Sequence, residues 1–286
     1  MSVLFGSLAA VMWALSTLAS SRSVRSAGQS SVVAWVMLVG LVETAPLVAA
    51  GGIPAALDAR AVGWLAVAGI GNVAGLLLTY AGLRVGKVGI VAPIVSAEGA
   101  VAAVIATVLG EELSLPAALA LALVAVGVVV SAIAPDPGIG PDPGRTTHPL
   151  RGALLASAAA TVFGFGLHAG GHLSGTLPAP WILLAPRLVG VAALTLPLAA
   201  RRQLAVPRPV WPLVVISGTA EVLGYFAYTL GAQHGVAVTS VIASKFAPVA
   251  ALAAFVLFRE RLGRVQVAGV LLLVAGITAT SLVATS

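Results

Sequence analysis

The sequence predicts an all-α integral membrane protein of ten transmembrane helices, arranged as two inverted five-helix repeats. Hydrophobic residues make up 59% of the 286 residues and charged residues only 8%, whereas soluble domains have roughly a quarter of their residues charged. Residues 63–131 recur at 212–280, shifted by 149 positions. Ten apolar stretches reach the length of about 20 residues that a membrane helix needs. A β-barrel is excluded because the stretches lack the alternation of polar and apolar residues that barrel strands show.

Matched glycines carry the evidence for the repeat. About one glycine pair is expected by chance over the aligned segments, given 32 glycines in the chain. Five pairs occur: Gly69 with Gly218, Gly75 with Gly224, Gly82 with Gly231, Gly86 with Gly235, and Gly127 with Gly276. A duplicated chain embedded in a membrane is typical of secondary transporters, whose binding sites lie where the two halves meet.

Turn residues and charges separate the ten expected spans. The first break runs from Arg22 to Gln29, and the longest, Pro135 to Pro149, holds five prolines and three glycines. That composition predicts an extended linker, so the first repeat covers residues 1–134, the linker 135–149 and the second repeat 150–286. The expected spans are 2–20, 31–50, 61–83, 88–109, 115–134, 150–172, 180–199, 210–231, 236–258 and 265–284.

The number of spans in each half predicts the inversion. With five spans per half, the second half enters the membrane from the opposite side to the first. The odd-numbered loops hold 12 cationic residues and the even-numbered loops hold only Arg60. The twelve are Arg22, Arg25, Arg84, Lys87, Arg145, Arg151, Arg201, Arg202, Arg208, Arg259, Arg261 and Arg264. The positive-inside rule then places the odd-numbered loops in the cytoplasm and both termini outside, in the cell (inner) membrane.

Short motifs at equivalent places in both halves resemble the EamA-type proteins of the drug/metabolite transporter superfamily. These motifs are the turns Gly110-Glu111-Glu112-Leu113 and Arg259-Glu260-Arg261-Leu262, and the pairs Trp13-Ala14 and Phe163-Gly164 in the first helix of each half. Arg187 and Pro248 also resemble family positions, although Met37 and Gly99 stand at their places in the first half. The resemblance implies ten helices in two five-helix repeats and, most often, export of a metabolite. It also implies termini in the cytoplasm, opposite to what the charge count predicts.

Five charged residues fall inside the expected spans: Glu43, Glu98, Arg187, Glu221 and Lys245. A charge in the hydrocarbon region is costly unless it is paired or faces a wet cavity, so such residues are functional by default. Structural ion pairs are the alternative reading. Glu111 and Glu260, by contrast, lie at loop turns and are expected to cap the helices that follow.

Glu221 and Asn72 are counterparts across the repeat and are expected at similar depth near the axis between the halves. Tyr225 and Tyr228 follow Glu221 on the same helical face. Together they offer a carboxylate and two aromatic rings to a cationic or amine-bearing ligand. The alternative is that Glu221 pairs with Arg187 and Tyr225 packs between helices.

Glu98 and Lys245 lie midway along the fourth and ninth spans. A pair between them would neutralise both charges, or would present the lysine to a carboxylate or phosphate. Because burial disfavours the charge on a carboxylate, Glu98 and Glu221 are candidates for carrying a proton in an exchange cycle.

Other residues have weaker signals. Pro93 and Pro248 interrupt the fourth and ninth spans, as hinges or as static kinks. Trp13 lies in the middle of its helix and is a candidate cavity wall, as is His168. His168 and His172 have the spacing of metal ligands, but two histidines without cysteine or nearby acids do not predict a metal site.

These observations predict a secondary active transporter, expected to be an exporter, that moves a small polar or zwitterionic metabolite such as an amino acid by alternating access. Neither enzymatic activity nor a cofactor is expected. No nucleotide-binding loop is present, so energy comes from a proton gradient or from exchange. The expected partners are a small-molecule substrate and membrane lipid, without nucleic acid, and the chain is expected to be a monomer or homodimer. The alternatives are a membrane-embedded enzyme acting on lipid head groups, or a channel.

Overall fold

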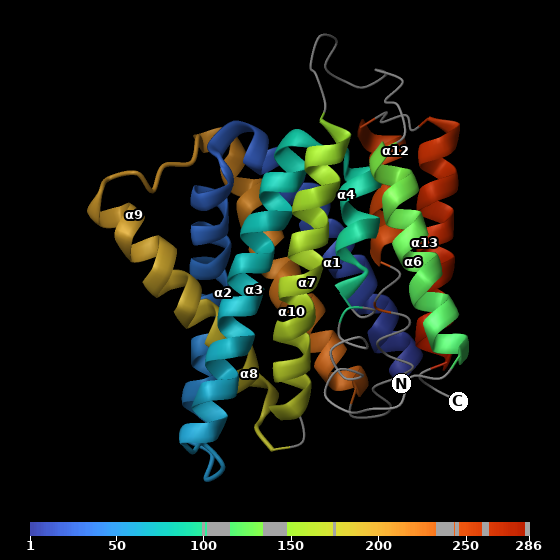
Figure 1. Cartoon of the computed structure of the whole chain (residues 1–286). Helices are drawn as coiled ribbons and strands as arrows, with labels where there is room; N and C mark the ends of the chain where they lie inside the picture. The colour runs from blue at the N-terminus through green and yellow to red at the C-terminus, as the bar shows by residue number, and fades with distance from the viewer. Residues whose placement is uncertain are drawn as a thin grey trace.

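A computed structural model describes residues 1–98, 101, 115–133, 148–173, 176–232, 243, 246–258 and 263–283, and every regular element in these ranges is helical (Figure 1). The first half contains α1 (Ser2–Ala27), α2 (Gln29–Gly51), α3 (Ala59–Val85), α4 (Val88–Val95) and α6 (Leu115–Ile133). The second half contains α7 (Pro149–Leu173), α8 (Ala179–Gly190), the π-helical turn η1 (Val191–Thr195), α9 (Leu196–Ala200), the 3₁₀ turn η2 (Arg208–Val210), α10 (Trp211–Ala232), α12 (Phe246–Phe258) and α13 (Arg264–Val283).

Six segments of the described residues are long and apolar enough to cross a membrane. They are Val3–Ala27, Gln29–Gly51, Ala59–Val85, Pro149–Gly170, Ala179–Ala200 and Arg208–Gly231. Two shorter apolar helical segments, Ala118–Gly127 and Val267–Gly276, lie within α6 and α13. The chain is therefore an all-helical, multi-pass membrane protein.

The boundary expected after the first helix is wrong. The polar run from Arg22 to Gln29 reads as a loop, but α1 continues to Ala27 and only Gly28, at a φ of 77°, separates it from α2. The helix persists because Ser21 and Ser23 donate hydrogen bonds to carbonyl oxygens three and four residues earlier in α1. Serine hydroxyls satisfied in this way fit inside a helix.

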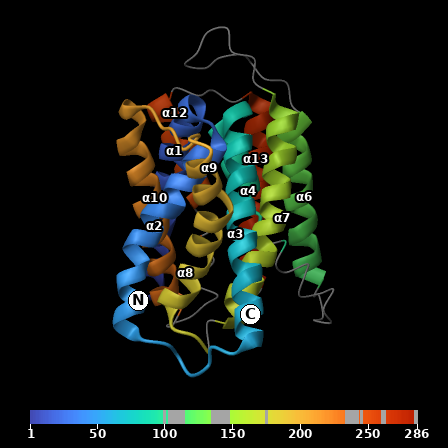
Figure 2. The ribbon, with the colours of Figure 1, turned by 90° about the vertical axis from the view of Figure 1, so that its left-hand side faces the viewer.

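Equivalent helices of the two halves run in opposite directions. In Figure 1, α1 starts at the lower end of the bundle, near the label N, whereas α7 starts at the upper end. Their contacts are also equivalent: α1 packs along α10, and α7 packs along α3. Figure 2 shows α6 and α13, which contact each other, on the same side of the bundle.

Close approaches at glycines repeat across the two halves. A Cβ atom added to Gly75 would lie 2.6 Å from the ring of Phe163, and one added to Gly224 would lie 2.6 Å from the ring of Trp13. Gly75 and Gly224 are repeat counterparts at the shift of 149, and Trp13 and Phe163 are counterparts at a shift of 150. The shift changes from 150 to 149 because the first half has one more residue than the second between its second and third helices. Each third helix therefore holds the first helix of the other half by the same contact.

The second helices meet in the same reciprocal way. A Cβ atom on Gly40 would lie 2.8 Å from Nε of Arg187, and one on Gly190 would overlap Cγ of Met37. Met37 and Arg187 are counterparts, as are Gly40 and Gly190. One half thus presents an uncharged side chain where the other presents a guanidinium.

Gly69→Ala is expected to lower the free energy of unfolding by about 1–3 kcal/mol, the usual cost of overpacking a tight contact. Its added Cβ atom would lie 3.1 Å from the backbone oxygen of Ala185 and 2.8 Å from Cγ2 of Val189, so α3 and α8 must separate. Gly63→Ala, on the same helix, meets nothing within 4 Å and is the matched control. Thermal melting in detergent measures the difference, and equal melting temperatures would contradict this packing.

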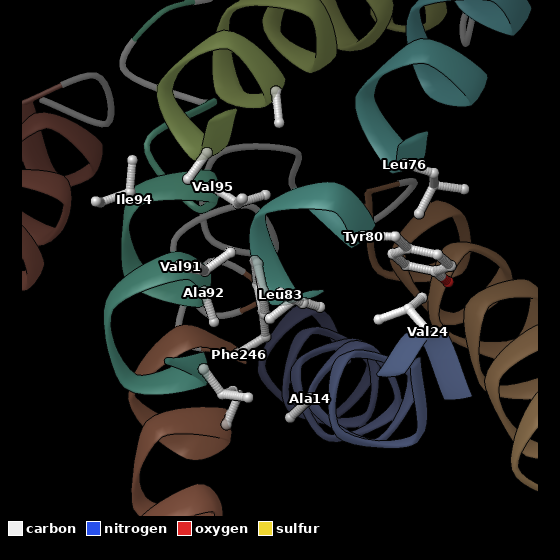
Figure 3. Close-up of a cluster of buried hydrophobic side chains, with 14 of the residues drawn as sticks. Ala14, Val24, Leu76, Tyr80, Leu83, Val91, Ala92, Ile94, Val95 and Phe246 are labelled. Atoms are coloured by element: carbon white, nitrogen blue, oxygen red, sulfur yellow. The ribbon is translucent and has the colours of Figure 1, made fainter. Parts of the chain in front are cut away.

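A large apolar core joins α1, α3, α4 and α12 (Figure 3). Val24, Leu83 and Val91 are fully buried there, and Tyr80 and Phe246 lie at its edge beside the cavity described below. This packing fixes the helices whose middle turns carry the polar side chains.

Candidate functional site

A central cavity of about 100 Å³ lies between the two halves. Helices α1, α3 and α4 of the first half and α7, α10 and α12 of the second half contribute to its wall. The lining residues are Trp13, Ser16, Thr17, Asn72, Leu76, Thr79, Tyr80, Val95, Glu98, Phe163, Glu221, Tyr225 and Phe246. Five of the residues predicted from sequence therefore meet in one chamber: Trp13, Asn72, Glu98, Glu221 and Tyr225.

Glu221 forms a buried ion pair with Arg187. The arginine side chain is only 1% exposed, and in the part of the chain that the structure describes its Nε and Nη1 atoms have no hydrogen-bond partner. It packs on Gly40 of α2 and is absent from the cavity lining. The pairing considered as an alternative in the sequence is thus present, while Glu221 still faces the cavity. Arg187 binds that carboxylate from outside the cavity and fixes its position.

Glu98 has a different environment. It lies just after α4, which ends at Val95, two residues beyond Pro93. Ser96 donates a hydrogen bond of 2.7 Å to the carbonyl oxygen of Pro93 at this break. Within the described residues, no cation pairs with the Glu98 carboxylate, which lines the cavity directly.

Two further polar groups at the cavity have no hydrogen-bond partner among the described residues. They are the Oδ1 atom of Asn72 and the Oγ1 atom of Thr79, and both are buried. Buried polar atoms in folded proteins are nearly always paired, and an unpaired one calls for an explanation. Since both residues line the cavity, a polar ligand there would supply the missing partners.

Aromatic rings form part of the cavity wall, and a further ring packs behind them. Trp13 lies 5.9 Å from Tyr228 and 6.1 Å from Phe246 between ring centroids, and Tyr225 lies 6.2 Å from Tyr228. Tyr228 is not part of the lining but packs against two rings that are. Ring faces near a cation are attractive to it, so this wall suits a ligand with an ammonium group.

A smaller side chamber of about 20 Å³, room for about one water molecule, adjoins the cavity. Asn72, Phe163 and Tyr225 line both spaces, and these side chains therefore separate them. The remaining lining is small or apolar: Ala68, Gly166, Ile182 and Pro186.

A cluster of hydroxyl groups beside the cavity is missing from the sequence prediction. Oγ of Ser217 lies 3.1 Å from Oγ of Ser16, 2.5 Å from Oγ of Ser20 and 3.2 Å from the hydroxyl of Tyr80. We call these four residues the hydroxyl cluster. The one signal in the sequence is the four-residue spacing of Ser16 and Ser20, which puts both on one face of α1.

The other predicted residues lie elsewhere. His168 and His172 flank Trp64, at ring distances of 6.2 Å and 4.8 Å, and neither lines the central cavity. Glu43 accepts a hydrogen bond of 2.6 Å from Thr219. Among the described residues no group of acidic, histidine or cysteine side chains suits a metal ion. Pro248 lies in α12, and three residues, Lys245, Glu111 and Glu260, lie outside the described part of the chain.

Comparison with known proteins identifies the fold and the family. A protein of known crystal structure superposes with a TM-score of 0.63 over 99% of this chain and 96% of its own, at 18% sequence identity, which indicates a shared fold. A search of curated proteins finds no match. The model of the EamA-like transporter family matches twice, at residues 1–133 and 150–282. Two such domains account for nearly the whole molecule, and the chain belongs to the EamA-like transporter family of the drug/metabolite transporter superfamily, whose members are transporters and not enzymes.

Proposed function

We propose that the protein is a ten-span secondary transporter, built from two inverted five-helix repeats, that exports a small zwitterionic or amine-bearing metabolite by alternating access. The observation that carries this proposal is the central cavity, whose wall is shared by both halves and holds Glu98 and Glu221 beside aromatic rings. Intramembrane acids around a chamber between repeats are characteristic of transport pathways.

The polar groups of the cavity suit the two ends of such a ligand. An ammonium group is attracted by the Glu98 carboxylate and by the rings of Trp13 and Tyr225. The unpartnered hydroxyl of Thr79 and the amide of Asn72 are available to the ligand's own polar or carboxylate end. A ligand with both ends satisfies atoms that are otherwise buried without partners.

The two acids have different roles in this proposal. Glu221 is paired with Arg187 and shapes the site. Glu98 has no cationic partner in the described residues and is the group that binds either a proton or the substrate's cation, which couples the two in exchange. The surplus of cations in the odd-numbered loops supports a cytoplasmic location for those loops.

Solute counterflow in liposomes tests the transport function. Labelled zwitterions and amines should accumulate transiently against an excess of unlabelled compound inside, saturably and without product formation. A channel gives no counterflow, and an enzyme gives a product. Failure of every amine and zwitterion, with protein that is folded and inserted, would overturn the proposed substrate class.

Asn72→Leu is expected to raise KM about tenfold, because it removes a hydrogen-bonding group from the cavity at nearly constant volume. Thr219→Val is the matched control, since Thr219 bonds to Glu43 and does not line the cavity. Initial counterflow rates over a range of concentrations give both values. An unchanged KM in Asn72→Leu would place the ligand elsewhere.

A further inference from the structure

We propose that the hydroxyl cluster of Ser16, Ser20, Tyr80 and Ser217 is the gate that seals one end of the transport pathway. The equivalent contact at the opposite end, between Gly166 and Ala68 beside the side chamber, is then a gate without hydroxyl groups. This inference rests on the proposed transport function and assigns its two gates to residues.

The hydroxyl cluster ties three helices together beside the cavity. Ser16 and Ser20 come from α1, Tyr80 from α3 and Ser217 from α10, and all four are at most 6% exposed. Ser217 is the shared centre, with Oγ contacts to the other three hydroxyls. Ser16 Oγ also lies 3.1 Å from the carbonyl oxygen of Ser217. Since Ser16 and Tyr80 line the cavity, the cluster forms its boundary at this end.

The repeat identifies the equivalent position in the other half. The counterparts of Ser16 and Ser20 are Gly166 and Gly170 in α7, and the counterpart of Ser217 is Ala68 in α3. Three hydroxyl-bearing residues at one end are thus matched by residues without side-chain polar atoms at the other. The counterpart of Tyr80 is Thr229, which bonds to the carbonyl oxygen of Tyr225 in its own helix.

The backbone contact is conserved between the two ends although the hydroxyls are not. A Cβ atom on Gly166 would lie 3.4 Å from the carbonyl oxygen of Ala68, matching the approach of Ser16 to Ser217. Gly166 and Ala68 both line the side chamber. At the chamber end the helices are therefore held by backbone packing, and the hydroxyl of Tyr225 lies 3.2 Å from where a Cβ atom on Gly170 would be.

Alternating access requires the two ends to close in turn. A transporter with inverted repeats exchanges the arrangements of its halves, so an element sealed at one end has an unsealed equivalent at the other. In this structure the buried hydrogen bonds stabilise closure at the cluster end, whereas among the described residues Gly166 and Ala68 meet by packing alone. The hydroxyl cluster thereby sets the balance between the two states.

The absence of cysteine from the chain allows a direct test by single-cysteine labelling. Leu76→Cys places a thiol in the cavity wall, and a membrane-impermeant maleimide is applied to vesicles of either orientation. When neither gate carries a substitution, labelling should be about tenfold faster from the chamber end, beside the 52–58 loop, than from the cluster end, beside Gly28, because hydrogen bonds between hydroxyls stabilise closure at the cluster end. Equal rates from both sides would overturn the inference.

Ser217→Ala in the Leu76→Cys background should raise the labelling rate from the cluster end about fivefold to tenfold, because it removes the centre of the hydrogen-bonded cluster. Tyr80→Phe, which removes one hydroxyl with little change of shape, should act in the same direction. Ser23→Ala is the matched control, since Ser23 is buried in α1 but bonds only to Ala19 of the same helix. A cluster variant that folds and labels like the control would overturn the gate.

The converse variant carries Gly166→Ser and Ala68→Ser together, which recreates the hydroxyls at the chamber end. It should slow labelling from that end by at least about fivefold. Labelling is measured without substrate, so the gate inference fails if the accessibilities do not move, whether or not counterflow occurs. The proposed function fails instead if accessibilities move as expected while no amine or zwitterion is transported.

Discussion

Arg187→Met is expected to destabilise the protein by about 3–5 kcal/mol, the cost of leaving a buried charge without its partner. Glu221 would remain in the cavity wall, with its side chain 9% exposed and its only described cation removed. Methionine fills much of the volume and is the residue that the first half has at this position, Met37. The loss is therefore electrostatic rather than a loss of packing, and thermal melting in detergent measures it.

The repeat supplies the compensating variant. Arg187→Met combined with Glu221→Asn gives the second half the two uncharged residues that the first half has at these positions, Met37 and Asn72. This double variant should recover most of the stability that Arg187→Met loses, because replacing a buried ion pair by neutral groups is often close to neutral. Recovery of the melting temperature without recovery of counterflow is the expected result. A double variant as unstable as Arg187→Met would show that the ion pair is not the cause.

Glu98→Gln is expected to abolish the dependence of substrate uptake on a pH gradient while leaving the protein folded. Glutamine keeps the size of the side chain but cannot release or take up a proton. Uptake driven by an imposed gradient should fall at least about tenfold, the scale of losing one essential ionisable group. Equilibrium counterflow at symmetric pH should fall less, because the aromatic wall and Asn72 remain.

Glu43→Gln is the matched control for this prediction. Glu43 also lies within a membrane-spanning helix, but its carboxylate bonds to Thr219 and does not line the cavity. Uptake by the Glu43→Gln protein should keep the native response to the pH gradient. A Glu98→Gln protein that is still driven by the pH gradient would assign the coupling to another group.

The sequence predicts the membrane class, the helices and the duplication because these depend on local composition and on spacing. The match of Gly69 with Gly218 already indicates the contact geometry: Gly69 lies against Val189 and Gly218 against Val39, which are counterparts themselves. The error at Arg22 to Gln29 has a local cause as well. Polar residues read as a loop when their hydrogen bonds are unknown, and here the serines bond within the helix.

The hydroxyl cluster and the separation of the two acids could not be predicted in the same way. Ser16 and Ser217 are 201 positions apart, and serine side chains in a helix bond to their own backbone as readily as to another helix. The sequence leaves Glu221 free or paired with Arg187, because distance in space decides between the two. It also gives no reason to select Phe163 as the wall between the two chambers.

The ion pair between Arg187 and Glu221 has a consequence for how a ligand can lie. A chamber with perfect twofold symmetry would accept any molecule in two equivalent poses, head to tail and tail to head, and would give neither end of the substrate a defined position. Met37 and Asn72 stand in the first half where Arg187 and Glu221 stand in the second, and the counterpart of Glu98 is Ala247, so the charges at the cavity do not follow the twofold symmetry. Under the proposed function, a bound molecule takes a single orientation along the pathway, so the same end of the substrate leads in every transport cycle.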